Sequence, residues 1–239
     1  MKKIAILSDI HGNSVALAAV LEHIRRQEIC IVLILGDFIG YYHRPQEVME
    51  MLEASRLDIT AVCGNHEQML EAAMQNGELW STIAGKYGHG LWIAKERLSK
   101  AAMGKLLNLP SVREFTIGNR SVIMSHGFPM DNVKYIYPDS QLEKYDLSHL
   151  KADIVIMGHT HYPMVGFTQG KLLINPGSVG QSRRYGGIAE WAVFYMDTGM
   201  VVPQCTPYDV QPVMKDCYKY DKNVPYLVEV LQRGKAICR

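Results

Sequence analysis

Five short stretches of the sequence place metal-binding side chains next to glycine. They are Asp9-Ile10-His11-Gly12, Gly36-Asp37, Gly64-Asn65-His66, His126-Gly127 and Gly158-His159-Thr160-His161. Their side chains supply two carboxylates, one amide and five imidazoles, without a thiolate. Oxygen and nitrogen ligands of this kind suit Mn, Fe, Zn, Ni or Co rather than a structural zinc site built on cysteine. Without His66, the set still exceeds the needs of one tetrahedral ion, which predicts two ions that share a bridging carboxylate.

Apolar runs that are typical of buried strands precede these stretches. The runs cover residues 4–7, 31–35, 59–63, 121–124 and 154–157. Helical spacing of apolar residues over 14–26 and 45–56 predicts helices between the first three strands. A β-α-β-α-β order predicts a mostly parallel sheet with helices on its faces, hence an α/β fold. Ligands of such sheets bind at the carboxyl ends of the strands, where these side chains are expected to meet.

The rest of the chain extends this plan without a linker or repeat, so we expect one domain over residues 1–239. Residues 68–105 are helical in pattern, and they form either a helical hairpin packed on the core or a cap that shapes a substrate pocket. Hairpins are expected over 113–124 and 165–174, joined to the rest by a polar connection over 129–148. A final strand follows at 191–196. Residues 203–239 read as an extension packed on the domain, with a short helix over 224–231.

Composition narrows the classes of function. The formal charge is +1, with 48% hydrophobic and 21% charged residues, as in an ordinary soluble protein without a strong nucleic-acid signal. No apolar stretch reaches the ~20 residues of a membrane span. Asp9 and His11 interrupt the apolar start before it resembles a signal peptide, so we expect a cytoplasmic protein. The five cysteines form no Cys-x-x-Cys pair, and Cys30 and Cys63 are interpreted as small buried apolar residues.

Taken together, the motifs resemble those of the calcineurin-like metallophosphoesterases. The matching set, in order, is Asp9-x-His11, Gly36-Asp37-x-x-Gly40, Gly64-Asn65-His66-Glu67, Ser125-His126-Gly127 and Gly158-His159-x-His161. The resemblance implies a four-layer α/β/β/α sandwich of two packed mixed sheets flanked by helices, with metals at the strand ends.

The same resemblance implies roles for the individual residues. Asp37 would bridge two divalent ions, the first held by Asp9, His11 and His161 and the second by Asn65, His126 and His159. A hydroxide between the ions would attack phosphorus in line. His66 would protonate the leaving oxygen or stabilise charge on the phosphoryl group. Manganese is the first choice of metal, with Fe, Zn, Ni, Co and Mg as alternatives.

Within that superfamily the chain is most similar to the small prokaryotic phosphodiesterases. The short length and the segment Asn175-Pro176-Gly177-Ser178 favour this subgroup. Protein serine/threonine phosphatases usually carry arginine directly after the Gly-Asp motif, whereas Phe38 stands there in this chain. The expected substrate is therefore a small phosphodiester, with nucleotide-derived diesters among the candidates.

Several assignments stay open at the level of sequence. Glu67 either orients the His66 imidazole or is an acid at a helix N-terminus. Arg183 and Arg184 either grip a phosphate or form a solvated turn, and Asn13 either contacts phosphate or caps a helix. Rival functions are a phosphomonoesterase or nucleotide phosphatase, a non-catalytic metal-binding module and a hydrolase of a non-phosphorus bond. Tyrosines and Met-rich helices either form a homodimer interface or pack inside.

Overall fold

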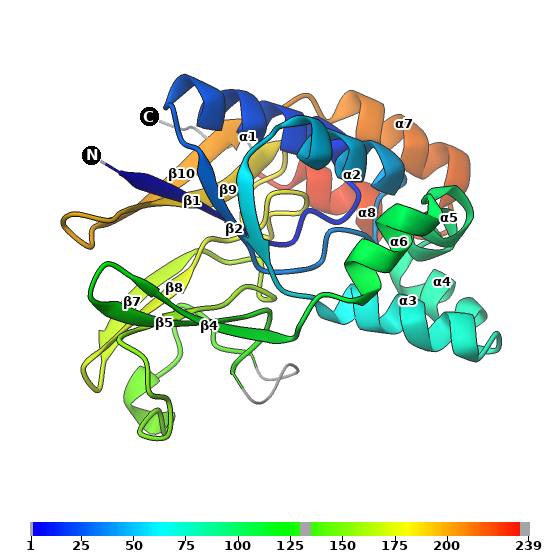
Figure 1. Ribbon diagram of the computed structural model, residues 1–239. Helices are drawn as coiled ribbons and strands as arrows, with labels where there is room; N and C mark the ends of the chain where they lie inside the picture. Colours follow the sequence, from blue (N-terminus) through cyan, green and yellow to red (C-terminus); the bar gives the residue numbers. More distant parts are fainter. Residues whose placement is uncertain (1, 130–134, 235–239) are drawn as a thin grey trace.

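Two β-sheets packed face to face form the centre of the computed structural model, which describes residues 2–129 and 135–234 (Figure 1). The strands in these ranges are β1 (Lys3–Leu7), β2 (Ile31–Ile34), β3 (Asp58–Ala61), β4 (Val112–Ile117), β5 (Arg120–Ser125), β6 (Ile154–Ile156), β7 (Met164–Thr168), β8 (Lys171–Asn175), β9 (Ile188–Tyr195) and β10 (Val201–Pro207). The described part of the first sheet has the order β10-β9-β1-β2-β3, and that of the second has the order β4-β5-β6-β8-β7.

Both sheets are mixed, with parallel strands at the centre. In the first sheet β1, β2 and β3 run parallel, while β9 and β10 are antiparallel additions. In the second sheet β5, β6 and β8 run parallel between the antiparallel edges β4 and β7. Parallel strands bring their carboxyl ends to one edge of a sheet, which collects the predicted ligand loops there.

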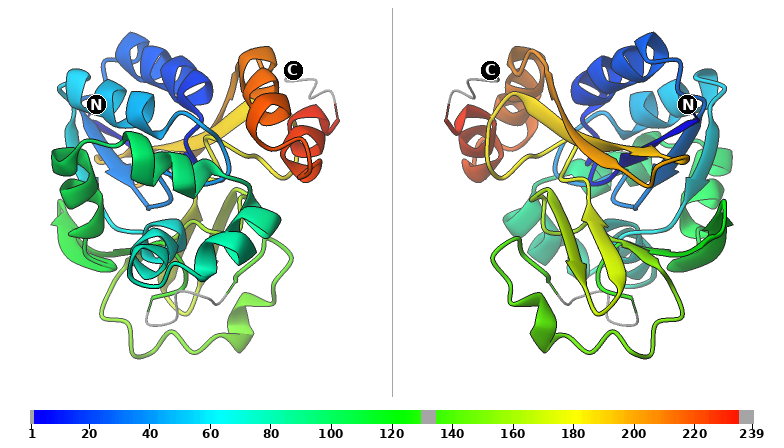
Figure 2. Two further views of the ribbon diagram at one scale, coloured as in Figure 1. Left: turned by 90° about the vertical axis from the view of Figure 1, so that its right-hand side faces the viewer. Right: turned by 90° about the vertical axis from the view of Figure 1, so that its left-hand side faces the viewer.

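Helices cover the outer face of the first sheet, as two further views show (Figure 2). The described α-helices are α1 (Ser14–Arg26), α2 (Pro45–Ala54), α3 (Asn65–Gln75), α4 (Leu79–Tyr87), α5 (Gly90–Arg97), α6 (Lys100–Leu107), α7 (Gln211–Tyr220) and α8 (Tyr226–Glu229). Residues of α1 to α6 form one apolar cluster with Ala5 and Leu7 of β1, whereas Ile4 and Ile6 point to the cluster between the sheets. Burial on both faces explains why the strand reads as a continuous apolar run. The prediction of two packed mixed sheets flanked by helices is confirmed.

The outer face of the second sheet has a different cover. Ile136, Leu147 and Leu150 of the connection before β6 pack on Val155 and Leu173 of the sheet. Between residues 135 and 153 this connection contains one short 3-10 turn, η1 (Leu142–Lys144), and otherwise irregular backbone. The predicted connection over 129–148 includes residues 130–134, which lie outside the described residues.

The segment 68–105 is helical, as predicted, but it is not a single hairpin. It comprises most of α3 together with α4, α5 and the start of α6. Leu70, Ile83, Leu91 and Leu98 bury their side chains in the cluster against the first sheet. These helices therefore belong to the core layer, and the chain enters them directly from the site, because α3 begins at Asn65.

The C-terminal region differs most from expectation. The predicted extension over 203–239 cuts through β10, which pairs with β9 from Val201 to Pro207. Pro203 and Pro207 hid this strand, since proline is accepted in a sheet only at an edge, which is where β10 lies. Helix α7 was also missed, and the predicted helix over 224–231 is only α8 followed by the 3-10 turn η2 (Val230–Gln232).

Cysteine burial was predicted correctly at one of two positions. Cys63 is buried after β3, but Cys30 is exposed, so its interpretation as a small buried residue is wrong. Residue 30 directly precedes β2 and lines an open surface hollow together with residues of α1 and α2. A cysteine next to an apolar run is therefore insufficient to predict burial.

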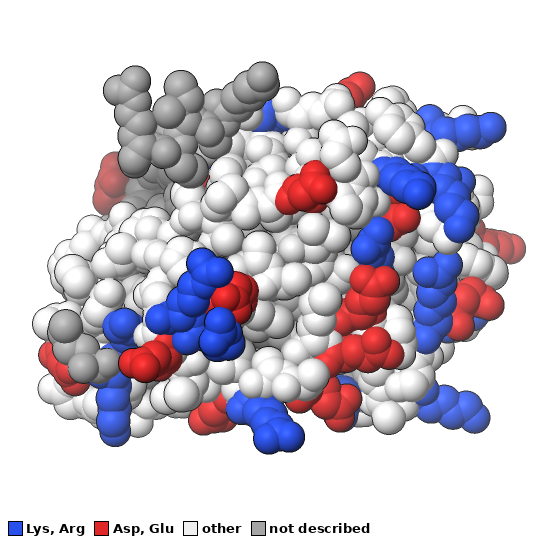
Figure 3. Space-filling model, turned by 90° about the horizontal axis from the view of Figure 1, so that it is seen from above, with Lys and Arg blue, Asp and Glu red and all other residues white. Residues whose placement is uncertain are grey.

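Neither a membrane-spanning helix nor, on the face seen from above, a patch of like charge is found in the described residues. None of the helices in residues 2–129 and 135–234 combines the length and the apolarity of a membrane span. Figure 3 views the molecule from above, and on that face lysine and arginine side chains alternate with aspartate and glutamate.

Candidate metal centre

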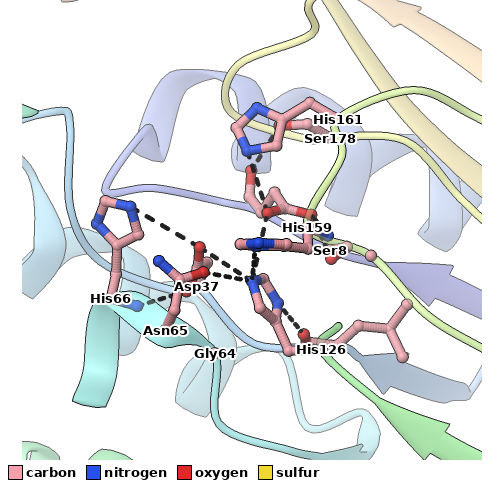
Figure 4. Close-up of polar contacts among 12 residues, drawn as sticks. Ser8, Asp37, Gly64, Asn65, His66, His126, His159, His161 and Ser178 are labelled. Atoms are coloured by element: carbon pink, nitrogen blue, oxygen red, sulfur yellow. Dashed lines mark hydrogen bonds and ion pairs between the residues drawn. The ribbon is translucent and has the colours of Figure 1, made fainter. Parts of the chain in front are cut away.

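The loops after five strands bring the predicted side chains into one buried cluster (Figure 4). Asp9 and His11 follow β1, Asp37 follows β2, and Asn65 and His66 open α3 after β3. His126 follows β5, and His159 and His161 follow β6. Asn65 is half-buried and the other seven are buried. The structure thus collects every residue of the predicted ligand set, together with His66.

Five of these residues adopt a left-handed backbone. The φ angles are 55° at Asp9, 52° at His11, 53° at Asp37, 69° at His159 and 60° at His161. Residues with a Cβ rarely occupy this region, and each instance costs of the order of 1–3 kcal/mol. Such strain concentrates at functional sites, where the rest of the fold holds side chains in place.

Asp9, His11 and His161 form the first group. The Nε2 atom of His161 lies 3.2 Å from Asp9 Oδ1, and that of His11 lies 3.5 Å from the same oxygen. The Nδ1 atoms of both rings face backbone carbonyls, His11 at 3.2 Å from Ile39 O and His161 at 2.7 Å from Gln181 O. Burial lowers the pKa of His161, which favours the neutral ring. With Nδ1 directed at a backbone carbonyl, each ring turns its Nε2 toward Asp9 and toward the other ring.

The two carboxylate oxygens of Asp9 differ in their hydrogen bonding. Its Oδ2 accepts hydrogen bonds from Ser8 Oγ at 2.5 Å and from the His159 amide at 3.0 Å. Its Oδ1 is buried and finds no hydrogen-bond donor among the described residues. Burial opposes ionisation, but His161 and His11 hold the pKa of this carboxyl well below its usual range. A buried carboxylate oxygen beside imidazole nitrogens fits a divalent cation.

Asp37, Asn65, His126 and His159 form the second group. The Nε2 atom of His126 lies 3.2 Å from Asp37 Oδ2, 2.9 Å from Asn65 Oδ1 and 3.1 Å from His159 Nδ1. The other nitrogen of His126 lies 2.7 Å from the Leu35 carbonyl oxygen. Burial favours the neutral ring, but Asp37 and Asp9 raise the pKa of His126 to about 10. The carboxylates therefore favour positive charge at this point.

Asp37 faces both groups with one oxygen. Its Oδ2 is 3.2 Å from His126 Nε2 and 3.7 Å from His11 Nε2, while its Oδ1 accepts the His66 amide at 2.8 Å. Burial opposes ionisation of Asp37, but the charges of His126, His66 and His11 hold the pKa of its carboxyl far below its usual range. The two groups thus share a carboxylate.

His66 stands at the edge of this cluster under two tyrosine rings. Its Nε2 lies 3.9 Å from Asp37 Oδ2, and its buried Nδ1 has no hydrogen-bond partner in the described residues. The ring centroids of Tyr41 and Tyr87 lie 4.9 and 5.2 Å away. Burial lowers the pKa of His66 to about 3. A Cβ at Gly40, where φ is +94°, would collide with the His66 ring, so glycine is required there.

Glu67 contacts backbone rather than the His66 imidazole. Its carboxylate accepts the amides of Gly64 at 2.7 Å, Asp37 at 2.9 Å and Phe38 at 2.9 Å. The interpretation of Glu67 as the residue that orients His66 is therefore wrong, and its place in the first turn of α3 agrees with the alternative. Burial and the charge of Asp37 raise the pKa of Glu67 to about 7, against the effect of the amides. Glu67 ties the loop after β2 to the loop after β3.

The segment 175–178 contacts the loops that carry the candidate ligands. Asn175 Nδ2 donates to the Gly158 carbonyl oxygen at 2.8 Å and to Thr160 Oγ1 at 3.0 Å. Ser178 Oγ donates to the carbonyl oxygen of Asp9 at 2.8 Å. Loops that carry ligands of both groups are therefore tied to one turn.

The candidate substrate residues differ in what they contact. Asn13 caps α1 through its Oδ1, which accepts the Ala16 amide at 3.0 Å, and its Nδ2 donates to the Gly180 carbonyl oxygen at 2.8 Å. Arg184 donates from Nε to the buried Glu190 carboxylate at 2.7 Å. Arg183 is partly buried, and its Nε finds no acceptor in the part of the chain that the structure describes. Burial would lower the pKa of Arg183, but Tyr41, Tyr226 and Asp9 raise it.

Two further aromatic residues line the site, although neither belongs to one of the ligand motifs. Tyr135 stacks on His159 with ring centroids 4.2 Å apart, and Tyr87 packs on His66 from the end of α4. Tyr87 lies 21 positions after His66, and Tyr135 lies nine positions after His126. Only the fold brings them to the cluster, so no local pattern could have identified them.

Comparisons with known proteins agree with this geometry. The model of the calcineurin-like phosphoesterase superfamily domain matches residues 1–199. An uncharacterized protein of Methanocaldococcus jannaschii, MJ0912, is 32% identical over 209 residues, which cover 80% of this chain and 82% of that protein.

Solved structures show the same fold. The hypothetical protein PH1004 of Pyrococcus horikoshii OT3 superposes with a TM-score of 0.87 at 22% identity, over 99% of this chain and 100% of the other. A metallophosphoesterase of Sphaerobacter thermophilus has a TM-score of 0.76 at 23% identity, over 95% of this chain and 99% of the other. With its cluster of histidine and aspartate side chains at the strand ends, the chain belongs to the calcineurin-like phosphoesterase superfamily.

Proposed function

We propose that this protein is a phosphodiesterase that works with two divalent metal ions. The observation that carries the proposal is the Oδ2 atom of Asp37, which faces His11 of one group at 3.7 Å and His126 of the other at 3.2 Å. Membership of the superfamily supports hydrolysis of phosphoric esters. The preference for diesters and the number of ions are the proposed parts.

Seven side chains would hold the ions. Asp9, His11 and His161 take the first ion, Asn65, His126 and His159 take the second, and Asp37 contributes to both. Imidazole, carboxylate and amide ligands suit manganese first, with Fe, Zn, Ni, Co and Mg as alternatives. When bound, the ions activate a water molecule near neutral pH and neutralise charge on the phosphoryl group.

His66 assists departure of the leaving oxygen. The imidazole is neutral because burial holds its pKa at about 3, so one ring nitrogen carries an N–H that can donate a hydrogen bond to the leaving oxygen. Tyr41 and Tyr87 restrict the orientation of the ring. A donor fixed beside the phosphoryl group stabilises the charge that develops on the leaving oxygen.

Arg183 is the proposed phosphate-binding side chain. Its charge lies within the field of Asp9 and Tyr41, and its Nε is buried without an acceptor in the described residues. Arg184 and Asn13 serve less well, because each is engaged by other groups of the fold. A guanidinium whose Nε has no acceptor in the described residues would suit the single negative charge of a diester.

Hydrolysis of bis-p-nitrophenyl phosphate beside p-nitrophenyl phosphate tests the proposal. The protein is stripped with a chelator and supplied in turn with Mn²⁺, Ni²⁺, Co²⁺, Zn²⁺ or Mg²⁺. Metal-restored turnover that favours the diester is the expected result. Preference for the monoester would replace the diesterase by a phosphomonoesterase, and lack of turnover despite bound metal would favour a non-catalytic module. The cytoplasmic location and the homodimer stay predictions from the sequence.

A further inference from the structure

A buried aspartate, Asp221, contacts the buried His43 and the half-exposed His89 outside the metal centre. Asp221, which directly follows α7, places its Oδ2 at 2.5 Å from His43 Nε2 and at 2.8 Å from the backbone nitrogen of His89. Its Oδ1 lies 2.6 Å from His89 Nδ1. Asp221 and His43 are 4% and 1% exposed. One carboxylate therefore joins the loop before α2, the turn between α4 and α5, and the end of α7.

Both histidine-bearing segments lead to the walls around His66. His43 lies two residues after Tyr41, whose ring packs 4.9 Å from the His66 ring. His89 lies two residues after Tyr87, whose ring packs 5.2 Å from the His66 ring. The rings of Tyr41 and Tyr87 also contact each other at 5.6 Å. Asp221 thus contacts both of the segments that carry the tyrosine rings packed on His66.

The segments around Gly40 and Gly90 are closely packed. A Cβ at Gly90 would lie 2.8 Å from the carbonyl oxygen of Tyr42 and 2.9 Å from the carbonyl carbon of Tyr41. A Cβ at Gly40 would collide with the His66 ring. Close packing transmits displacement, so a shift of the turn between α4 and α5 moves the loop that supports His66.

The residue that makes these contacts lies beyond the residues that the family model matches. The family match ends at residue 199, whereas Asp221 belongs to the segment 201–234 that adds β10, α7 and α8 (Figure 1). Val213, Met214 and Leu227 of this segment form an apolar cluster with Tyr41 and Tyr42. The C-terminal segment is therefore built against the wall of the site as well as against the sheet.

We propose that Asp221 is a positioning residue for the reaction: it fixes Tyr41 and Tyr87 so that His66 meets the leaving group. This inference rests on the role proposed for His66. A buried carboxylate is costly unless it is paired, and here its partners are the two segments that need alignment.

The test compares Asp221→Asn with Asp216→Asn. Asp216 is the matched control because it also lies on the C-terminal segment and contacts the same loop, accepting from Arg44 Nε at 2.6 Å. That pair is partly exposed, and such pairs contribute little. The first readout is the Cε1–H resonance of His66 in chelator-stripped protein, which senses the ring currents of Tyr41 and Tyr87. We expect a shift in Asp221→Asn and none in Asp216→Asn.

The second readout is kinetic, with bis-p-nitrophenyl phosphate and Mn²⁺. Asp221→Asn should lower kcat roughly 10-fold or more at unchanged metal content, because small misplacements of a catalytic group are costly. In a His66→Ala background the same change should have no further effect on kcat, since coupled residues are not additive.

Several outcomes would overturn the proposal. They are an unchanged His66 resonance, equal shifts in both aspartate variants, and a kcat effect of full size in the His66→Ala background. If the wild type shows no turnover, the proposed function fails, and the resonance still decides the structural claim. If Asp221→Asn does not fold, His89→Ala replaces it, because that side chain is half exposed and its loss removes one arm of the cluster. An unchanged His66 resonance in His89→Ala would equally contradict the inference.

Discussion

The Nε2 atoms of His11 and His161 face each other at 3.0 Å, although the Nδ1 atoms of both rings point at backbone carbonyl oxygens. Each carbonyl is best satisfied by an N–H on Nδ1, which leaves a lone pair on each Nε2. Two lone pairs at this distance repel unless a cation lies between them or a proton is added. The backbone thus orients both rings for cation binding, because a carbonyl that accepts from Nδ1 fixes the ring and leaves Nε2 for the metal.

Metal binding should therefore stabilise the fold. An ion at about 100 times its Kd contributes about 2.7 kcal/mol to the free energy of unfolding. For a chain of this length, we expect Mn²⁺ to raise the Tm of chelator-stripped protein by roughly 5–10 °C. Thermal unfolding monitored by circular dichroism measures this. The His161→Ala variant is the control and should show a smaller rise, while identical Tm values of stripped and loaded wild type would contradict the site.

Replacement of His66 by alanine separates two possible roles. His66 groups with His11 and Asp37 as a possible ligand set, but the proposal gives it the leaving group instead. We expect both ions to stay bound while turnover of the diester falls ~100-fold or more. Metal analysis and steady-state kinetics on the same preparation measure both quantities. A variant that has lost an ion would make His66 a ligand, and unchanged turnover would remove it from the mechanism.

Glu67→Gln tests the tie between the loops after β2 and β3. Glutamine replaces one carboxylate oxygen by an NH₂ group, which would face the backbone amides that Glu67 accepts. We expect a loss of about 1–3 kcal/mol in the free energy of unfolding and a metal affinity roughly 10- to 100-fold weaker. Urea unfolding and metal titration provide the two numbers. Glu71→Gln, an exposed change on the same helix, should alter neither, and an equal effect there would refute the tie.

Alanine substitutions of the adjacent Arg183 and Arg184 should affect different quantities, the first substrate binding and the second stability. Arg183→Ala should raise KM for the diester with little change in Tm, because its Nε has no acceptor among the described residues. Arg184→Ala should instead lower the free energy of unfolding by about 1–3 kcal/mol, because it leaves the buried Glu190 carboxylate without its partner. Kinetics and denaturant unfolding of both variants reveal the pattern. The reverse assignment of effects would show that Arg184 binds the phosphate.

Much of the fold could be predicted because its strands and helices are marked by local sequence patterns. The parallel strands are apolar runs, since both faces of each sheet are covered, and the loops after β1, β2, β3, β5 and β6 carry the candidate ligands. Pro45 marked the start of α2 and Asn13 that of α1. The seven candidate ligands followed from the same logic, because residues at the ends of parallel strands meet in space.

Other features depend on contacts that no local pattern encodes. The partners of Glu67 are amides on another loop, so the sequence could not distinguish them from the His66 ring. β10 carries two prolines and reads as a strand only once β9 is known to lie beside it. The cluster of His43, His89 and Asp221 joins residues separated by more than 130 positions, and only the packed C-terminal segment reveals it.

The proposed two-metal centre depends on Asp37 as a shared ligand, and metal content tests this role most directly. Wild type and Asp37→Ala are stripped, loaded with Mn²⁺, freed of excess ion and analysed for metal per chain, with diester turnover measured on the same samples. We predict close to two ions per chain in the wild type, and in Asp37→Ala the loss of most of the metal and essentially all turnover. Close to two ions in folded Asp37→Ala would contradict the shared carboxylate, and a single ion in saturated wild type would contradict the two-metal centre.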